Sequence, residues 1–264
     1  MTGGVAALPM YDWPEITGAT DRLWAAIRDA LRADGIAAPE TLDHEIGLMA
    51  GWRHPQLVLG QTCGLPFVRD LAGRVALVGA ADYALPGCPP GWYRSAVVVR
   101  ADDARDRLAA FRGARLAVNG FDSQSGWGSI LRHAAPLAER GRFFAEAAVS
   151  GAHRASLAMV SGGAADIAAI DAVSWRLAQR WAPETAGLRV LMLTEPTPGL
   201  PLIAAAGTDA ARHAAAVAAG IAALDPEARA ALGIAGFAAL VPDDYRLIGE
   251  RLAVAAAAAS GGSI

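Results

Sequence analysis

Cysteine is scarce in this chain, because its 264 residues contain only Cys63 and Cys88. The spacing of the two matches no metal-binding motif, and the sequence shows no other metal cluster. We therefore expect neither a metal nor a cofactor. The two thiols could form a disulfide in an oxidising compartment, although two free thiols are the default expectation.

Long hydrophobic runs are also lacking. Hydrophobic residues make up 54% of the chain, yet no stretch approaches 18 uninterrupted apolar residues, so no membrane span is expected. The first twelve residues have neither a basic segment nor a sustained apolar core, which argues against a signal peptide. The expected location is periplasmic if a leader has been removed, and otherwise cytoplasmic.

Charge of one sign is not concentrated anywhere. The formal net charge is −3, with both signs mixed along the chain, and no basic run is long enough to follow a phosphate backbone. This distribution excludes an electrostatic footprint for nucleic acid. We expect no nucleic-acid partner.

Short apolar segments of four to six residues alternate with segments of helical periodicity. This alternation predicts an α/β protein with mainly parallel sheets flanked by helices. The periodicity predicts a helix from Thr17 or Thr20 to Asp34 and helices over 42–49, 103–112 and 172–181. It predicts strands over 114–118, 142–149 and 188–193.

The domain organisation follows from the position of the sheet-forming segments. The helix-rich part after Pro201 has no sheet of its own, so we expect it to pack back on the N-terminal part. This gives a discontinuous lobe 1, made of residues 1–96 plus 200–264, and a lobe 2 of residues 97–199. The two crossings between the lobes would be Val97 to Ala101 and Leu193 to Leu200.

The stretch V-N-G-F-D-S-Q-S-G-W-G-S-I, residues 118–130, carries the clearest functional signal. A short strand enters it, and a helix is predicted to leave it and to reach about Arg140. A strand that turns through small polar residues into a helix presents unpaired backbone N–H groups and the positive end of a helix dipole, which together bind anions. The alternative is that Ser123 or Ser125 only caps the helix.

Four other residues are candidates because of where they stand next to predicted strands and helices. His153 opens a helix after a Ser-Gly turn, and its alternative role is that of a capping or core histidine. Asp171 lies at the carboxyl end of a strand, where open α/β sheets place ligand groups, but it could equally be a helix N-cap. Gln61 follows a strand and could hydrogen-bond the ligand. Tyr11 lies at the end of the first strand, and its alternative role is that of an ordinary strand-ending turn residue.

Four blocks of the sequence resemble a known family: Q-T-C-G-L-P (61–66), G-W-Y-R-S-A-V-V-V-R (91–100), N-G-F-D-S-Q-S-G-W (119–127) and S-G-A-H-R-A-S-L-A-M-V-S-G-G-A-A-D-I-A-A-I-D (150–171). With these blocks the chain resembles the phosphate, phosphite and phosphonate solute-binding proteins of ABC transporters. That family has the two-lobed type II periplasmic binding protein fold. The likeness spans roughly residues 5–207.

The resemblance implies a ligand cleft between the lobes and a hinge that closes around the ligand. It implies that the turn at 123–127 contacts an oxyanion head group. Ser123 and Ser125 would donate hydroxyl hydrogen bonds, and Gly126 and Trp127 would supply backbone N–H groups. His153 would face the same head group, and Tyr93 would contact it from the other lobe.

The same turn departs from the family's pattern. Phosphonate binders typically carry a run of Ser and Thr here, whereas this chain interleaves Asp122 and Gln124. A carboxylate near a phosphate is repulsive unless it points away or is protonated. Asp122 would then cap the helix itself, or it would favour a zwitterionic or neutral ligand.

The sequence therefore predicts a protein that captures a small oxyanion or organophosphonate for an ABC transporter. Its partners would be a small anionic or zwitterionic ligand and a transporter permease. The alternative is a cytosolic enzyme or ligand sensor on the same fold, of the kind found in menaquinone or thiamine-pyrimidine biosynthesis. No motif in the chain names a reaction, which favours binding without catalysis.

Overall fold

The computed structural model describes residues 4–260 of the chain, and their side chains as far as residue 255. It divides into two units. Unit 1 runs to Trp92 and resumes over Pro198–Tyr245, and unit 2 comprises Tyr93–Thr197 and the chain from Arg246 onward. The lobes predicted from the sequence differ from these units, because they put residues 93–96 and the chain from residue 246 onward in lobe 1. The predicted lobe boundaries stay a prediction.

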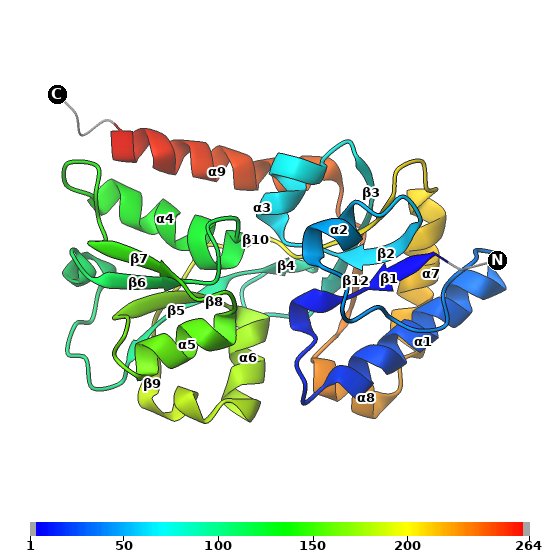
Figure 1. Ribbon diagram of the computed structural model, residues 1–264, viewed down its shortest axis with the longest axis horizontal. Helices are drawn as coiled ribbons and strands as arrows, with labels where there is room; N and C mark the ends of the chain where they lie inside the picture. The colour runs from blue at the N-terminus through cyan, green and yellow to red at the C-terminus, as the bar shows by residue number, and fades with distance from the viewer. Residues whose placement is uncertain (1–3, 261–264) are drawn as a thin grey trace. The chain divides into compact units, whose positions relative to one another are not determined.

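Unit 1 is built on a five-stranded sheet with the strand order β1-β2-β11-β3-β12 (Figure 1). β1 is parallel to β2, whereas β11 is antiparallel to β2 and β3, and β12 is antiparallel to β3. The strands are β1 (Val5–Ala7), β2 (Leu57–Gln61), β3 (Val75–Asp82), β11 (Pro201–Ala205) and β12 (Gly236–Ala238). The helices are the 3-10 turn η1 (Pro9–Tyr11), α1 (Thr17–Ala33), α2 (Leu48–Trp52), α3 (Gly64–Pro66) with the π-helical η2 (Phe67–Leu71), α7 (Ala210–Ala223) and α8 (Pro226–Leu232).

Unit 2 is built on a second five-stranded sheet with the order β7-β6-β8-β5-β9. β6 is parallel to β7 and β8, and β5 is antiparallel to β8 and β9. The strands are β5 (Ser95–Arg100), β6 (Arg115–Val118), β7 (Glu146–Val149), β8 (Ile167–Asp171) and β9 (Leu188–Leu193). The helices are η3 (Leu108–Phe111), the π-helical η4 (Gln124–Gly128), α4 (Ser129–Ala134), η5 (Ala135–Leu137), α5 (His153–Ser161), α6 (Ala172–Trp181), η6 (Pro183–Gly187) and α9 (Pro242–Ser260), which begins in unit 1.

Each sheet is mixed, because β11 in unit 1 and β5 in unit 2 run against their parallel neighbours. The edge strand β12 of unit 1 is also antiparallel to its neighbour β3. A strand is forced to be parallel only where a crossover connection, usually a helix, returns the chain to the same edge. β5 and β11 instead follow directly on the two-residue strands β4 (Trp92–Tyr93) and β10 (Thr197–Pro198). The expected parallel arrangement therefore does not apply to these two strands, nor to β12.

Several elements lie where the sequence predicts them. The helix α6 and the strand β9 have the predicted bounds, and α1 differs from its prediction by one residue at its end. The predicted strand over 142–149 is shorter, since β7 begins at Glu146. The helix after residues 118–130 ends at Ala134 and continues only as the turn η5, which contains Pro136.

Two predicted helices are wrong, and both fail for the same physical reason. In the segment 103–112 the Asp103 carboxylate accepts the backbone N–H and the side chain of Arg105, and only η3 forms. In the segment 42–49 Asp43 accepts the backbone N–H groups of Glu45 and Ile46, and the helix α2 begins only at Leu48. Short carboxylate side chains compete with helical hydrogen bonds in this way.

The helices α1 and α7 pack against one another in unit 1 through a glycine (Figure 1). A Cβ atom at Gly220 in α7 would lie 2.5 Å from the Cα atom of Ile27 in α1, and Ile27 is fully buried. The backbones therefore approach too closely for any side chain at this position. By contrast, a Cβ at Gly249 in α9 would meet nothing within 4 Å.

We expect Gly220→Ala to destabilise the protein by about 1–3 kcal/mol, since the added methyl forces α7 away from α1. The matched control is Gly249→Ala, which should be neutral or stabilising by up to about 1 kcal/mol because alanine is the better helix former. Urea unfolding of both variants measures the two changes. Equal effects would show that backbone proximity at Gly220 is not limiting.

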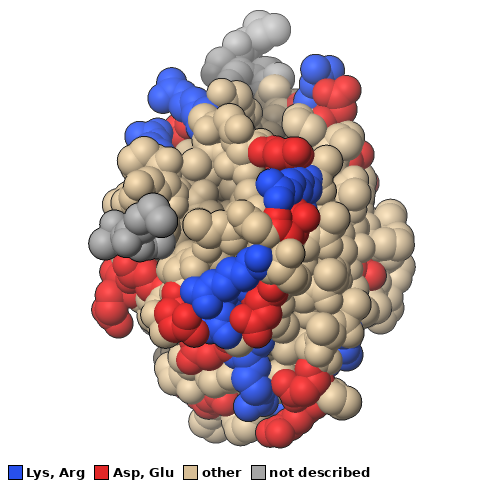
Figure 2. All heavy atoms as spheres, turned by 90° about the vertical axis from the view of Figure 1, so that its right-hand side faces the viewer, with Lys and Arg blue, Asp and Glu red and all other residues tan. Residues whose placement is uncertain are grey.

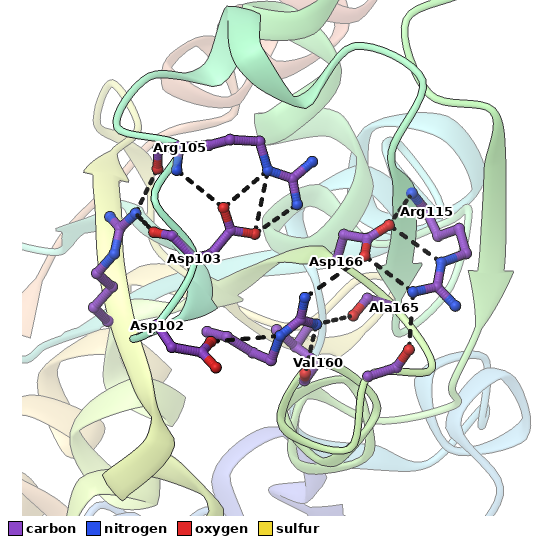
Figure 3. Close-up of polar contacts among 10 residues, drawn as sticks. Asp102, Asp103, Arg105, Arg115, Val160, Ala165 and Asp166 are labelled. Atoms are coloured by element: carbon purple, nitrogen blue, oxygen red, sulfur yellow. Dashed lines mark hydrogen bonds and ion pairs between the residues drawn. The ribbon is translucent and has the colours of Figure 1, made fainter.

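At the amino edge of the unit 2 sheet, arginines and aspartates form a connected network (Figure 3). Asp166 accepts the backbone N–H of Arg115 at 2.8 Å and pairs with its guanidinium at 3.0 Å. Arg100 approaches the same carboxylate at 4.0 Å. The hydrogen bond from Arg115 holds the pKa of Asp166 below its usual range. Asp102 is different, because its side chain is 86% exposed and its contact to Arg100 is 3.7 Å long.

Asp166→Ala should therefore cost about 1–2 kcal/mol of unfolding free energy, since it leaves the backbone N–H of Arg115 without its acceptor. Asp102→Ala should change stability by no more than about 0.5 kcal/mol, because the pair is exposed. Chemical denaturation at neutral pH compares the two. A similar loss in both variants would mean that the network acts only through its net charge.

The charged surface mixes both signs. The chain has no lysine, so all 23 basic side chains are arginines. On the face shown in Figure 2 they are interspersed with acidic side chains. Typical pairs of unit 1 are Arg28 with Glu40 and Arg212 with Asp34. Within residues 4–260, no helix is both long enough and apolar enough to cross a membrane.

Candidate functional site

Three helices of unit 2 begin at one edge of its sheet. The strands β7, β6 and β8 are neighbours and parallel, so their carboxyl ends meet at that edge. A turn after β7 leads into α5, the turn after β6 leads into η4 and α4, and β8 leads directly into α6 (Figure 1). The positive ends of three helix dipoles therefore gather where open α/β sheets bind ligands.

The turn after β6 is closed by Ser123. Its side-chain Oγ accepts the N–H of Gly126 at 3.0 Å, and its carbonyl accepts the N–H groups of Trp127 and Gly128 at 3.1 and 3.0 Å. Ser123 is thus the N-cap of η4, as one of the two sequence interpretations proposed. The predicted donors Gly126 and Trp127 are corrected here, because both N–H groups already have an acceptor within the turn.

Asparagine and glutamine side chains fill the space beside two glycines of this turn. A Cβ at Gly126 would lie 1.9 Å from Oδ1 of Asn119, and a Cβ at Gly128 would lie 2.5 Å from Oε1 of Gln124. Neither position can carry a side chain without moving these amides. Gln124 is 3% exposed, and it lines a small cavity of unit 2 together with His133.

Ser125 lies at the centre of a group of hydrogen-bonding side chains. Its Oγ is 2.8 Å from Nε2 of His153, the first residue of α5, and 3.4 Å from Oγ of Ser123. Its carbonyl accepts the hydroxyls of Ser95 in β5 and Ser129 in α4. The structure therefore brings together Ser123, Ser125 and His153 from two turns, as the sequence predicts for an anion site.

His153 is electrically neutral at physiological pH. Burial lowers the pKa of its imidazole to about 4, and its Nδ1 is buried without a hydrogen-bond partner among the described residues. A neutral imidazole has two tautomers. If Nε2–H donates to Oγ of Ser125, the serine hydroxyl proton is directed elsewhere and can be donated to a bound oxygen.

The remaining predicted residues of unit 2 have structural roles of their own. The carboxylate of Asp171 caps α6, accepting the N–H groups of Val173 at 2.7 Å and Ser174 at 3.2 Å. Tyr93 ends β4 and is 2% exposed, and it belongs to unit 2, whereas the resemblance implies a contact from the other lobe. Asp122 is exposed and does not cap the helix, which corrects one of the roles considered for it: Ser123 occupies the N-cap position.

The other two predicted residues belong to unit 1. Gln61 is the last residue of β2 and Tyr11 is the last of η1, and both line one cavity of that unit. The ring of Tyr11 also meets that of Tyr83 edge-on, with centroids 5.2 Å apart. A ligand-binding role for either residue stays a prediction.

Sequence reasoning missed the two serines that support Ser125 from behind. Ser129 stands four residues after Ser125, a spacing at which a helical hydroxyl reaches a preceding carbonyl, so a local signal existed. Ser95 lies 30 residues earlier in β5 and has no such signal. Only the order of strands in the sheet brings it to the turn.

Residues 61–245 match the family described as ABC transporter, phosphonate, periplasmic substrate-binding protein. The chain belongs to this family. No curated protein is similar enough to match the chain.

Solved structures show the same fold at low sequence identity. PhnD1 from Prochlorococcus marinus in complex with methylphosphonate has a TM-score of 0.72 at 17% identity, covering 94% of this chain and 96% of that one. The binding protein component PA3383 of an ABC phosphonate transporter from Pseudomonas aeruginosa has a TM-score of 0.71 at 14% identity, covering 99% and 89%. The aliphatic sulphonate binding protein SsuA from Escherichia coli has a TM-score of 0.62 at 14% identity, covering 96% and 86%.

These findings confirm the predicted family and the type II periplasmic binding protein fold. The family consists of solute-binding proteins that serve ABC transporters, so this chain binds a small molecule and has a membrane permease as its partner. It is a binding protein and not an enzyme, which removes the enzymatic alternative considered from the sequence.

The lowered pKa of His153 makes a prediction about stability. The unfolded imidazole takes up a proton near pH 6.5 and the folded one only near pH 4, so the folded state is penalised as the pH falls through this window. Between pH 7 and pH 4.5 the wild type should lose about 1–3 kcal/mol through this group. His153→Gln should lack that part of the pH dependence. Urea unfolding at both pH values measures it, and parallel losses in the two proteins would contradict it.

Proposed function

We propose that this protein captures a small oxyanion or organophosphonate, and that Ser123, Ser125 and His153 hold the anionic head group. The observation that carries the proposal is the 2.8 Å contact between Ser125 Oγ and a neutral His153 at the start of α5. Hydroxyl and neutral imidazole groups are donors that a partly buried anion accepts without requiring a fixed positive charge.

The caps of the three helices support this placement of the anion. α6 is capped by Asp171 and η4 by Ser123, so acceptors already serve their first N–H groups. α5 has no side-chain cap among the described residues, and its N-cap position is held by Ala152. An oxygen of a bound anion would supply the acceptor that α5 lacks, beside the histidine with which α5 begins.

The other predicted contacts complete the proposed binding set. Gln124, Gly126, Asp171 and Tyr93 of unit 2 are proposed to shape the site or to contact the solute. Gln61 and Tyr11 of unit 1 are proposed as ligand-binding residues. The exposed carboxylate of Asp122 is compatible with a zwitterionic solute. We further propose a periplasmic location, in keeping with the description of the family.

Isothermal titration against phosphate, phosphite, methylphosphonate and 2-aminoethylphosphonate tests the proposed solute class directly. We expect saturable binding of at least one of them, driven by charge-assisted hydrogen bonds to the head group. Sulfate provides a control for a tetrahedral anion of another class. Failure of all four phosphorus oxyanions to bind would leave the family and the fold but remove the proposed solute.

Ser125→Ala and His153→Gln should each weaken binding of the same anion about 10- to 100-fold, because each removes a polar contact that contributes about 1–3 kcal/mol. Ser156→Ala is the matched control. Ser156 is a fully buried serine of α5 whose hydroxyl bonds to Ser150 at 2.7 Å. It should lower stability and leave the affinity unchanged. Equal weakening in the control would point to a general loosening of α5.

A further inference from the structure

The helix α9 crosses the boundary between the two units. It runs without interruption over Pro242–Ser260, and the boundary falls between Tyr245, which belongs to unit 1, and Arg246, which belongs to unit 2. The chain also crosses the boundary within each of the two-residue strands β4 and β10. The helix α9 is therefore a third covalent connection between the units.

The crossing that contains β10 has few hydrogen-bond donors of its own. Its sequence T-E-P-T-P-G-L-P, residues 194–201, has proline at three of the eight positions, and proline lacks a backbone N–H. The strands β10 and β4 form a sheet of two strands, which is marginally stable by itself. The carbonyl oxygens are therefore the groups by which a neighbouring element can hold this segment.

The first turn of α9 holds the 194–201 segment within unit 1. The hydroxyl of Tyr245 donates to the carbonyl of Gly199 at 3.0 Å, and the tyrosine is fully buried. Its ring packs edge-on against that of Phe67, with the centroids 5.0 Å apart. Burial raises the pKa of the Tyr245 hydroxyl, so the group stays protonated and remains a donor.

The following turns of α9 hold the same segment within unit 2. Arg251 donates from Nη1 to the carbonyl of Pro196 at 2.7 Å, and its Nη2 lies 3.4 Å from the carboxylate of Glu195. Nε of Arg132 in α4 binds that carboxylate at 2.9 Å. The side chain of Arg251 is 17% exposed and that of Glu195 is 48% exposed, so solvent screens the ion pair. The hydrogen bond to the Pro196 carbonyl is therefore the stronger anchor.

The two anchors match in length. Tyr245 and Arg251 are six residues apart in α9, which corresponds to a rise of about 9 Å. Gly199 and Pro196 are three residues apart, which an extended chain spans in about 10 Å. Tyr245, the buried Ile248 and Arg251 recur every three residues, so they share one face of the helix. The order of the contacts shows that this face of α9 runs antiparallel to the 194–201 segment.

We propose that α9 is a splint for this crossing, which fixes the 194–201 segment at two points and limits flexing between the units when no solute is bound. A hinge moves where a few backbone torsions change. Because a continuous helix sets the separation of Gly199 and Pro196, the torsions of Thr197 and Pro198 between them can change little unless one anchor breaks. This inference goes beyond the proposed function and makes no use of the solute.

Spin labels on the two units measure the flexing directly. Cys63 and Cys88, which are free thiols of unit 1, are replaced by serine. The label sites are Glu227→Cys in unit 1 and Asp102→Cys in unit 2, where the native side chains are 88% and 86% exposed. Double electron–electron resonance of the full chain without ligand gives the distribution of distances between the labels. We expect one narrow distribution for this labelled parent.

Arg251→Met and Tyr245→Phe each remove one anchor and keep most of the side chain that packs around it. Each should raise the share of distances outside the main peak about fivefold, because each loses one hydrogen bond to a carbonyl. Glu250→Gln is the matched control, since Glu250 is an exposed residue of the same helix and precedes Arg251. It should leave the distribution unchanged. Circular dichroism checks that each variant is folded, and Arg251→Gln replaces Arg251→Met if the latter is not.

Broadening in the two anchor variants and not in the control supports the splint. Unchanged distributions in both folded anchor variants would overturn it, and so would broadening in only one of them, because a splint requires both points. Equal broadening in Glu250→Gln would show a general loosening of α9 instead, and a broad distribution in the labelled parent would show that nothing limits the flexing. The phosphonate titrations test the proposed function separately, and their failure leaves this inference standing.

Discussion

The hydrogen bond between Ser125 and the neutral imidazole of His153 joins the two turns that follow β6 and β7. The two residues lie 28 positions apart and come from different turns, yet their side chains meet at 2.8 Å. Burial holds the pKa of His153 near 4, because a charged imidazole would lose its hydration without gaining a counter-charge. A neutral ring can accept or donate a hydrogen bond at Nε2. Either the serine hydroxyl or the imidazole can therefore be the donor within the pair, depending on what the solute requires.

The sheet of unit 2 makes this contact possible. Parallel neighbouring strands deliver their carboxyl ends to one edge, and the connections that follow β6 and β7 therefore start side by side. The antiparallel strand β5 adds Ser95, whose hydroxyl fixes the carbonyl of Ser125 from behind. Local turn chemistry places each hydroxyl, and strand order decides which hydroxyls meet.

The sequence was informative wherever short-range chemistry decides the structure. The turn at 118–130, the start of α5 and the bounds of α6 follow from spacing and capping signals within a few residues. The segment 103–112 shows the limit, because its periodicity is helical but Asp103 holds Arg105 in a local loop. Which amides of the turn remain available also could not be predicted, since Ser123 uses its side chain and its carbonyl to occupy them.

The positions of the arginines in unit 2 explain how the proposed anion site can be built without an arginine side chain. Three of their contacts lie at the C-terminal end of α5: Arg100 donates to the carbonyls of Val160 and Ala165, and Arg115 donates to that of Gly163 (Figure 3). Cations at that end compensate the negative pole of the helix dipole. The positive pole, at His153, is then left without a side-chain cap among the described residues. The helix α5 thus has arginines of the protein at its C-terminal end and the proposed anion at its N-terminal end. The anion is held by the helix dipole in place of a salt bridge. A protein that delivers its solute to a permease would have to break such a salt bridge at each release.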